Sequence, residues 1–343
     1  MKKGILGFLF FVSLVAVSQQ QSTFNDKVVQ VDSSGNYSFI VGGHFYGNRY
    51  STSGYPANSI LANIEWINAQ NPAMLICLGD LFMDVKNNIP QYEKSFFNRL
   101  NVPLFNAVGN HDLTADIYQK NFGATFFKFQ LGRDMHVVLD TESDNGNITG
   151  EQLKLLESLK GEKYDHIFIY AHRTVWKNMY EEMENIFSDN TQSLLGNNYE
   201  KEVYPLLSEL SKNSKVYWFS GSIGNAPASF FYHHDTSAKI TYIATAIRGI
   251  KRDALLMVNV KNGQVSFKTH SLTGEDLMPL EDYNVEYWQT NSGVEPFNWR
   301  LLPLYIKQTV LSWSFWWGVV VTLLFTATLV FIQRRRNKGR KVK

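Results

Sequence analysis

Along the central part of the chain, short apolar runs alternate with segments whose apolar residues recur at helical spacing. In the segment 58–70, Leu61, Ile64 and Ile67 fall on one helical face, so this segment predicts a helix. Two further helices are predicted near 91–100 and at 149–159. The apolar runs are typical of strands and lie at 37–43, 74–79, 103–109, 125–132, 135–140, 166–171, 215–220, 240–246, 254–260 and 264–270.

Local signals refine this pattern. Thr149 and Gln152 have the spacing of a capping box, which predicts a helix that begins at 149. Asn262 and Gly263 stand between two alternating runs, which predicts a tight hairpin. Helical crossovers early in the chain and hairpins late predict an α/β domain with mixed sheets, over residues 34–271.

An apolar segment precedes this domain. Lys2 and Lys3 come before thirteen mostly apolar residues and a small-residue A-x-S site, which predicts a secretory signal over residues 1–18. An uncleaved anchor helix is the alternative, but thirteen residues span a bilayer poorly.

A second apolar segment follows the domain. Residues 310–332 are 23 residues without a charge, and Trp313, Trp316 and Trp317 lie near their start. We expect a spacer at 272–307, a transmembrane helix at 308–333 and a basic cytoplasmic tail at 334–343. The domain would then be extracytoplasmic, anchored to the membrane by a single C-terminal helix.

Charge and cysteine content narrow the function classes. The last ten residues hold seven Lys and Arg, and without them and Lys2 and Lys3 the chain has 24 basic and 31 acidic residues. A domain with a net negative charge is a poor binder of nucleic acid, so no nucleic acid is expected as a specific partner. The sole cysteine, Cys77, excludes an internal disulfide, so the hydrophobic core must stabilise the domain.

Polar residues with metal-binding or proton-handling side chains follow several predicted strands. His44 follows the first, Asp80 the second, Asn110 and His111 the third, and His172 the strand at 166–171. Open α/β sheets place their binding sites beyond the carboxyl ends of the strands. The repetition of this arrangement predicts one shared site.

On these motifs the chain resembles the calcineurin-like metallophosphoesterase superfamily over roughly residues 37–271. That superfamily builds a two-metal site from the motifs D-x-H, G-D, G-N-H-D/E, a lone H after a strand, and G-H-x-H. Here they correspond to "GGH" (42–44), "LGD" (78–80), "GNHD" (109–112), "YAH" (170–172) and "GSIG" (221–224). The resemblance implies a sandwich of two mixed β-sheets flanked by helices, and phosphoester substrates.

The first and fifth motifs depart from the pattern of the superfamily. Gly42 stands where the resemblance implies an aspartate, and Ser222 and Gly224 stand where it implies two histidines. The metal ligands that remain of the implied seven are Asp80, Asn110, His172 and His44. Because the first metal position keeps only two ligands, we expect at most one divalent ion, at the position of Asp80, Asn110 and His172.

Other residues are candidates to replace the missing ligands. His233, His234 and Asp235 form a polar group past the fifth motif, although a polar hairpin tip is the favoured interpretation. Asp84 either points into the cleft or caps the segment that follows it. Asp140 and Glu142 are interpreted as surface carboxylates or as carboxylates that brace a loop.

Two functional hypotheses follow. In the first, the chain is an extracytoplasmic phosphoesterase with an impaired one-metal site, in which His111, oriented by Asp112, protonates the leaving oxygen of a phosphomonoester or phosphodiester. In the second, the chain is a non-catalytic pseudo-phosphoesterase whose cleft binds a phosphate-bearing ligand or a protein partner. The retained "GNHD" favours the first hypothesis, and the altered first and fifth motifs favour the second.

Overall fold

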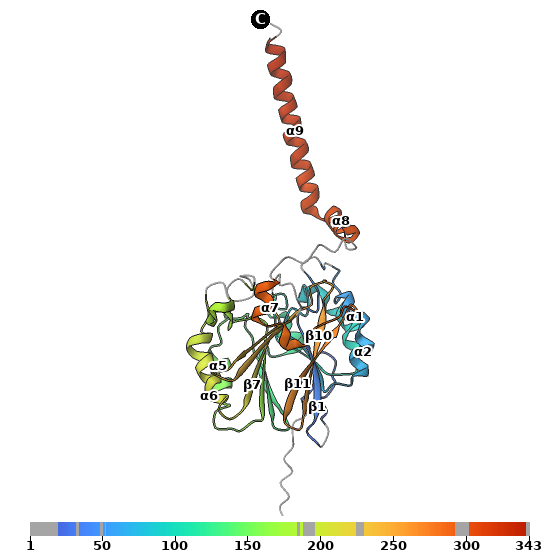
Figure 1. Ribbon diagram of the computed structural model, residues 1–343. Coiled ribbons are helices and arrows are strands. Elements are labelled where there is room, and N and C mark those ends of the chain that lie inside the picture. The colour runs from blue at the N-terminus through green and yellow to red at the C-terminus, as the bar shows by residue number, and fades with distance from the viewer. Residues whose placement is uncertain are drawn as a thin grey trace, which may run out of the picture.

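The domain is a sandwich of two mixed β-sheets with helices on both outer faces (Figure 1), as the sequence predicts. The computed structural model describes residues 20–31, 34–48, 51, 53–183, 186–187, 196–223, 230–291 and 302–340. The predicted signal segment and Gly224 lie outside these residues.

One sheet has five strands. Its strands β1, β2 and β3 are parallel, with β3 at one edge, and the late hairpin of β10 and β11 adds to β1 in antiparallel fashion. In spatial order the strands are β11 (Gln264–Ser271), β10 (Ala254–Lys261), β1 (Tyr37–Gly42), β2 (Met74–Cys77) and β3 (Leu104–Asn106).

The other sheet has six strands. Its central strands β5, β6, β7 and β9 are parallel, and an antiparallel strand closes each edge. In spatial order the strands are β4 (Phe127–Leu131), β5 (Asp134–Val138), β6 (His166–Ala171), β7 (Lys215–Ser220), β9 (Ile240–Thr245) and β8 (Phe230–Asp235).

Helices cover the two outer faces of the sandwich, with α1 and α2 beside the five-stranded sheet and α5 and α6 beside the other (Figure 1). The helices are α1 (Asn58–Ala62), α2 (Ile64–Ala69), α3 (Val85–Ser95), α4 (Ile117–Phe122), α5 (Gly150–Glu157), α6 (Tyr204–Leu210), α7 (Val285–Thr290), α8 (Leu302–Leu311) and α9 (Trp313–Arg340). The single-turn helices are η1 (Phe97–Arg99), η2 (Lys177–Met179), η3 (Glu181–Met183), η5 (Tyr199–Val203) and η6 (Leu280–Asp282).

Strand β1 shows how the alternation of side chains builds two apolar layers. Phe39 packs between the sheets, edge-on to Phe168 of β6 with the ring centres 5.2 Å apart. Ile40, the next residue, points to the opposite face and joins the core beneath the outer helices. Both side chains are fully buried, and each such burial stabilises the fold by about 1.5–3 kcal/mol.

Three local predictions need correction. The predicted helix at 58–70 is interrupted at Asn63, whose side-chain amide donates to the carbonyls of Ser59 and Leu272. The capping box does not form, because Gln152 bonds the backbone of Asp140 instead. The helix predicted near 91–100 begins earlier, at Val85. The Asp84 side chain caps this helix by accepting a hydrogen bond from the backbone N–H of Lys86.

Helix α9 extends away from the sandwich as a single long helix (Figure 1). An 18-residue window within Trp313–Arg334 has a mean hydropathy of 2.1, and none of this window is buried. By length and composition it is long and apolar enough to cross a membrane, which agrees with the predicted span.

Candidate metal centre

The functional candidates converge at the edge of the sandwich where the parallel strands of both sheets end. His44 follows β1, Asp80 follows β2 and His172 follows β6. Nε2 of His44 lies 3.7 Å from Oδ2 of Asp80, and Nε2 of His172 lies 3.8 Å from Oδ1 of the same carboxylate. The three ligand atoms all lie within 4.8 Å of one another, and we call these residues the carboxyl-edge cluster.

The hydrogen bond of the His172 ring directs a lone pair at the carboxylate. Nδ1 of His172 lies 2.8 Å from the carbonyl oxygen of Leu78, which can only accept, so this nitrogen carries the proton and Nε2 does not. Nε2 of His44 is buried and has no hydrogen-bond partner among the described residues. Acceptors that face one another in this way repel unless a cation or a proton lies between them.

The arrangement fits a divalent ion. Nitrogen and oxygen ligands bound to one ion at about 2.0–2.2 Å lie roughly 3–3.5 Å from one another, so the two histidine–carboxylate separations of 3.7 and 3.8 Å need only a slight closing. A histidine that donates its other N–H to a backbone carbonyl, as His172 does to Leu78, is the usual partner of a protein-bound metal. Two histidines and one carboxylate therefore form a plausible set of three protein ligands.

The glycines of two motifs are needed because polar atoms lie directly against them. A β-carbon at Gly109 would lie 2.3 Å from Oδ1 of Asp80, and one at Gly79 would lie 2.5 Å from Nδ1 of His172. Gly79 also has φ of +85°, in the left-handed region. The "LGD" and "GNHD" glycines thus allow two chain segments to pack against the cluster.

Two members of the cluster are held in an unfavourable backbone conformation. His44 and Asp80 have φ of +54° and +53°, a region that costs a non-glycine residue on the order of 1 kcal/mol or more. Backbone hydrogen bonds hold both loops, since the N–H of His44 donates to Gly79 and the N–H of Tyr46 donates to Asp80. Such strain is common at functional sites, where the surrounding structure maintains it.

The electrostatics suit a cation ligand set. Burial lowers the pKa of His44 to about 4, although Asp80 opposes the shift, so His44 is neutral at neutral pH. Burial raises the pKa of Asp80, but the charges of His172, His44 and His111 outweigh it, and the net result is a pKa below the usual value. A neutral imidazole and an ionised carboxylate are the forms that bind metal.

His111 lies beside the cluster, but its contacts differ from those predicted. Its backbone N–H donates to Oδ1 of Asp80 over 3.1 Å, and its Nδ1 donates to the carbonyl of Met83 over 3.0 Å. The carboxylate of Asp112 instead accepts from the backbone N–H groups of Phe82 and Gly109 and from the Asn106 amide. In this structure the Met83 carbonyl, rather than Asp112, orients the ring of His111.

Burial and the nearby charge of Asp80 raise the pKa of Asp112 to about 6. Its three hydrogen bonds, all to groups of the "GNHD" turn or its neighbours, stabilise the turn. Asp112 therefore has a structural role in the geometry that we observe.

The remaining candidate ligands lie apart from the cluster in the described contacts. Asn110 is exposed, and none of the contacts described joins its amide to Asp80. Ser222 is buried, and its backbone N–H donates to the carbonyl of His172, as that of Gly221 does. A β-carbon at Gly42 would meet Leu255 Cδ2 at 2.5 Å, within the apolar core, so an aspartate there would not point at the ion without rearrangement.

The proposed substitutes for the missing ligands have other partners. His233 and His234 lie on the edge strand β8, and the Asp235 carboxylate accepts from the hydroxyls of Tyr180 and Tyr204. None of the three belongs to the carboxyl-edge cluster. Glu142 forms a largely buried ion pair of 2.5 Å with Arg173, next to His172, which agrees with the predicted bracing role.

Sequence analysis missed two residues near the cluster. The ring of Tyr46 lies between those of His44 and His111, at centre-to-centre distances of 5.6 and 5.2 Å. Arg248 follows β9, and its positive charge contributes to the low pKa of His44 after burial and His172. The rule that found the histidines also applies to Arg248, because β9 is parallel to β7 and ends at the same edge.

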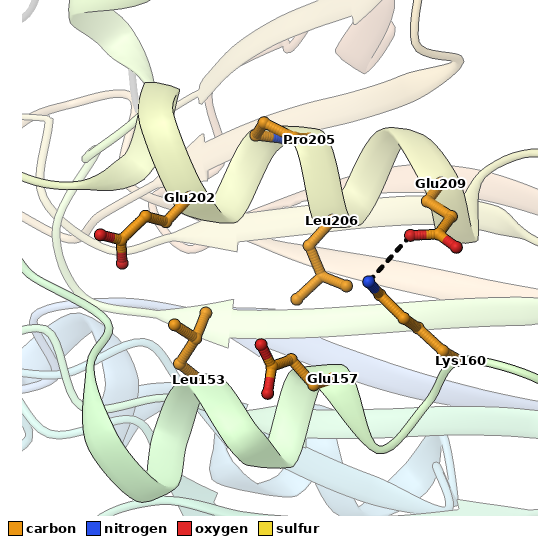
Figure 2. A pocket seen from close by; sticks show the side chains of 7 residues that line it. All are labelled: Leu153, Glu157, Lys160, Glu202, Pro205, Leu206 and Glu209. Carbon is orange, nitrogen blue, oxygen red and sulfur yellow. Dashed lines mark ion pairs between the residues drawn. The ribbon is translucent and has the colours of Figure 1, made fainter.

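A separate hollow of about 290 Å³ lies on the outer face, between α5 and the η5–α6 segment (Figure 2). Its polar lining consists of Glu157, Glu202, Glu209 and Lys160, and the lysine is paired with Glu209 at 2.9 Å. The excess of carboxylates would repel a phosphate group. This hollow is therefore no candidate for a phosphoester site.

Two mixed sheets with histidines and a carboxylate at the carboxyl ends of their parallel strands form an α/β sandwich with a candidate metal site. The sequence profile of the calcineurin-like phosphoesterases matches residues 54–288. The chain therefore belongs to the calcineurin-like phosphoesterase family, as its motifs predict. The matched region begins after the altered first motif.

Comparison with solved structures includes a purple acid phosphatase, PPD1, from yellow lupin (Lupinus luteus) seeds. The sequence identity is 11%, the TM-score is 0.45, and the match covers 72% of this chain and 53% of that one, about half its length. A search among curated proteins finds no matching sequence.

Proposed function

We propose that this chain is a membrane-anchored metallophosphoesterase that acts outside the cytoplasm with a single divalent ion. The observation that carries the proposal is the carboxyl-edge cluster, in which two imidazole nitrogens face one carboxylate at 3.7 and 3.8 Å. The buried Nε2 of His44, without a hydrogen-bond partner in the described part of the chain, supports the same ion. The substrate would be a phosphomonoester or a phosphodiester.

The ligands of the ion would be His44, Asp80 and His172, and Asn110 would join them if its exposed side chain turned inward. A bound divalent ion would supply Lewis-acid polarisation of a phosphoryl oxygen and a bound water of lowered pKa. In the sequence motifs of the family His44 and His172 correspond to different metal positions. Here the ligand atoms of both histidines lie within 4.8 Å of each other and of the Asp80 carboxylate, which supports one ion held by all three residues.

His111 would assist the departure of the leaving group. Since its Nδ1 donates to the Met83 carbonyl, its Nε2 is the nitrogen that can take up and release a proton. The half-buried ring lies at the border of the cluster, next to Tyr46, where a substrate oxygen could reach it. Protonation of a poor leaving group by such a residue is worth about 10²–10⁴-fold in rate.

The ion is tested by metal titration of the purified full chain in detergent. We expect one equivalent of Mn²⁺ or Zn²⁺, lost in His44→Ala and retained in His234→Ala, which removes an exposed histidine from β8. Two tightly bound equivalents would contradict the one-ion proposal, and none would contradict the metal centre.

Activity is tested with p-nitrophenyl phosphate, its diester and an alkyl phosphate. We expect slow turnover of the activated esters, and His111→Ala should reduce the alkyl phosphate rate far more than the aryl rate, because only the alkyl leaving group needs protonation. If no rate exceeds the metal-free background, the protein is a non-catalytic binding module, which is the alternative that the altered motifs favour.

Topology is tested by protease treatment of intact cells. The apolar helix Trp313–Arg334 and the basic residues that follow support a single span with the C-terminus in the cytoplasm. We expect added protease to digest the domain and to spare an epitope at Lys343. Protection of the domain would contradict this orientation.

A further inference from the structure

The loop between β9 and β10 packs against the loop that carries His44. The backbone N–H of Ile247 donates to the carbonyl of Gly43 over 2.9 Å. A β-carbon at Gly249 would lie 2.4 Å from the side-chain amide nitrogen of Asn48, so the two loops are in close contact. Arg248 stands between these two points of attachment and is half-buried.

A buried carboxylate fixes the conformation of this loop. Asp253 is 1% exposed and accepts from the backbone N–H groups of Arg248, Gly249 and Ile250 at 3.0, 2.8 and 3.2 Å. Three consecutive donors on one carboxylate hold the backbone of Arg248 in one conformation. The side chain therefore starts from a fixed point at the carboxyl edge of both sheets.

The loop that carries Arg248 packs on the accessible side of the carboxyl-edge cluster. The His44 side chain is 16% exposed, whereas those of Asp80 and His172 are 3% and 2% exposed. Solvent thus meets the cluster on the side of His44, against whose loop the Arg248 loop packs.

A guanidinium at this place has a defined chemical use. Its planar set of N–H donors matches two oxygens of a phosphate group, and its charge does not depend on pH. A site with two divalent ions brings the charge of both to a phosphate, but this cluster provides ligands for one ion. A fixed cation beside the ion would make up part of the missing positive charge.

We propose that Arg248 binds the non-bridging oxygens of the phosphate group of the substrate or ligand, in place of the second metal ion of the family. The inference rests on the proposed site for the location of the phosphate. It does not require turnover, because an anion can bind to the guanidinium with or without catalysis. The ligand class is a phosphate group with at least two free oxygens.

The test is calorimetric titration of the full chain in detergent with inorganic phosphate, with Mn²⁺ present and again with chelator. We expect Arg248→Gln to weaken phosphate binding at least tenfold in the presence of Mn²⁺, since a charged hydrogen-bonding group is lost. Arg248→Lys keeps the charge without the planar donor set, so its affinity should fall between those of the parent and the glutamine variant.

Lys251→Gln is the matched control. Lys251 is an exposed cation three residues along the same loop, so its removal changes the net charge equally. We expect phosphate affinity within twofold of the parent. If Lys251→Gln and Arg248→Gln weaken phosphate binding equally, the effect is one of net charge and the inference is wrong.

Ion binding separates this inference from the proposed function. We expect Arg248→Gln to retain the parent's Mn²⁺ affinity and its circular dichroism spectrum, because Arg248 is no ligand of the ion. If Arg248→Gln binds phosphate as the parent does while His44→Ala loses Mn²⁺, the inference fails and the metal centre stands. If neither the parent nor any variant binds Mn²⁺ but phosphate binding still depends on Arg248, the metal centre fails and the inference stands.

Discussion

The carboxyl-edge cluster and a second buried group contain the same side-chain types in different bonding states. The second group begins at the amino ends of β1, β5 and β6 and runs inward between the sheets. We call it the interior network, and its members are Tyr37, Asp134, His136, His166 and Tyr170.

The hydrogen bonds of the interior network run in one direction. Tyr37 donates to Asp134 over 2.8 Å, so it accepts from Nε2 of His136 over 3.0 Å, and Nδ1 of His136 accepts from Tyr170 over 2.9 Å. His166 completes the set with a contact of 2.8 Å to Asp134. Apart from Nε2 of His166, its histidine nitrogens and carboxylate oxygens have partners at hydrogen-bond distance.

The difference lies in distance. His166 and Asp134 of the interior network are 2.8 Å apart, whereas the histidine nitrogens of the carboxyl-edge cluster stop 3.7 and 3.8 Å from the Asp80 carboxylate. Direct contact satisfies buried polar groups and stabilises the fold. Separation with lone pairs directed inward leaves the same groups incomplete, which suits a cation. We therefore assign a structural role to one group and a binding role to the other.

The largest expected effect is on stability, from Asp134→Ala. This change leaves His166 and Tyr37 buried without their charged partner, and we expect a loss of about 3–5 kcal/mol in the free energy of unfolding. Urea denaturation in detergent with chelator measures it. Asp165→Ala, which breaks an exposed ion pair with Arg133 nearby, is the control and should change little. A small change in the free energy of unfolding in Asp134→Ala would contradict the structural role of the interior network.

The next largest effect is the stabilisation of the folded protein by the bound ion. At an ion concentration of 100 times the Kd, the parent should gain about 2.7 kcal/mol, and Asp80→Asn should gain nothing because the shared ligand is lost. Without ion, Asp80→Asn should be slightly less stable than the parent, since the histidines around Asp80 favour its ionised form in the folded state. Asp134→Asn should keep the ion-dependent gain. If Asp80→Asn keeps it too, the cluster is not the ion site.

A smaller effect is the pH dependence that His136 contributes. Burial lowers the pKa of His136 to about 3, with Asp134 opposing the shift and His166 adding to it. The pKa of His136 is lower in the folded protein than in the unfolded chain. The neutral His136 ring therefore contributes stability that is present above about pH 6.5 and is lost as the pH falls. Between pH 7 and pH 5 the loss is about 2 kcal/mol.

We expect His136→Gln to flatten the decline of unfolding free energy over this pH range. His234→Gln, on the exposed side of β8, should leave the decline unchanged. An unchanged pH slope in His136→Gln would show that this ring does not titrate as its burial implies.

The smallest effect concerns Ser222. Its described contact is the backbone N–H bond to His172, so loss of the hydroxyl in Ser222→Ala should change ion affinity less than twofold. Ion affinity is measured by titration with Mn²⁺ against His172→Ala, which should lose binding. A tenfold loss of ion affinity in Ser222→Ala would show that the hydroxyl is a ligand of the ion and that the altered fifth motif still contributes to the metal site.

Much of the site was predictable because it depends on local patterns. An apolar run followed by a polar residue places that residue at a strand end, and this identified His44, Asp80, His111 and His172. The partner of His111 was not predictable, since sequence adjacency suggested Asp112 and the fold brings in the Met83 carbonyl. Arg248 was missed because no motif marks it.

By itself, the sequence determined the alternating strands and helices, the two apolar segments at its ends, and which motifs of a two-metal site are kept or altered. These follow from side-chain type and spacing, which act over a few residues. Only the tertiary structure decided that His44 and His172, from different sheets, share the carboxylate of Asp80. It also decided that a side chain at Gly42 would enter the apolar core, and that the loop of Arg248 packs against the loop of His44. Contacts between residues far apart in sequence depend on sheet order and on the packing of the two sheets, which no local pattern encodes.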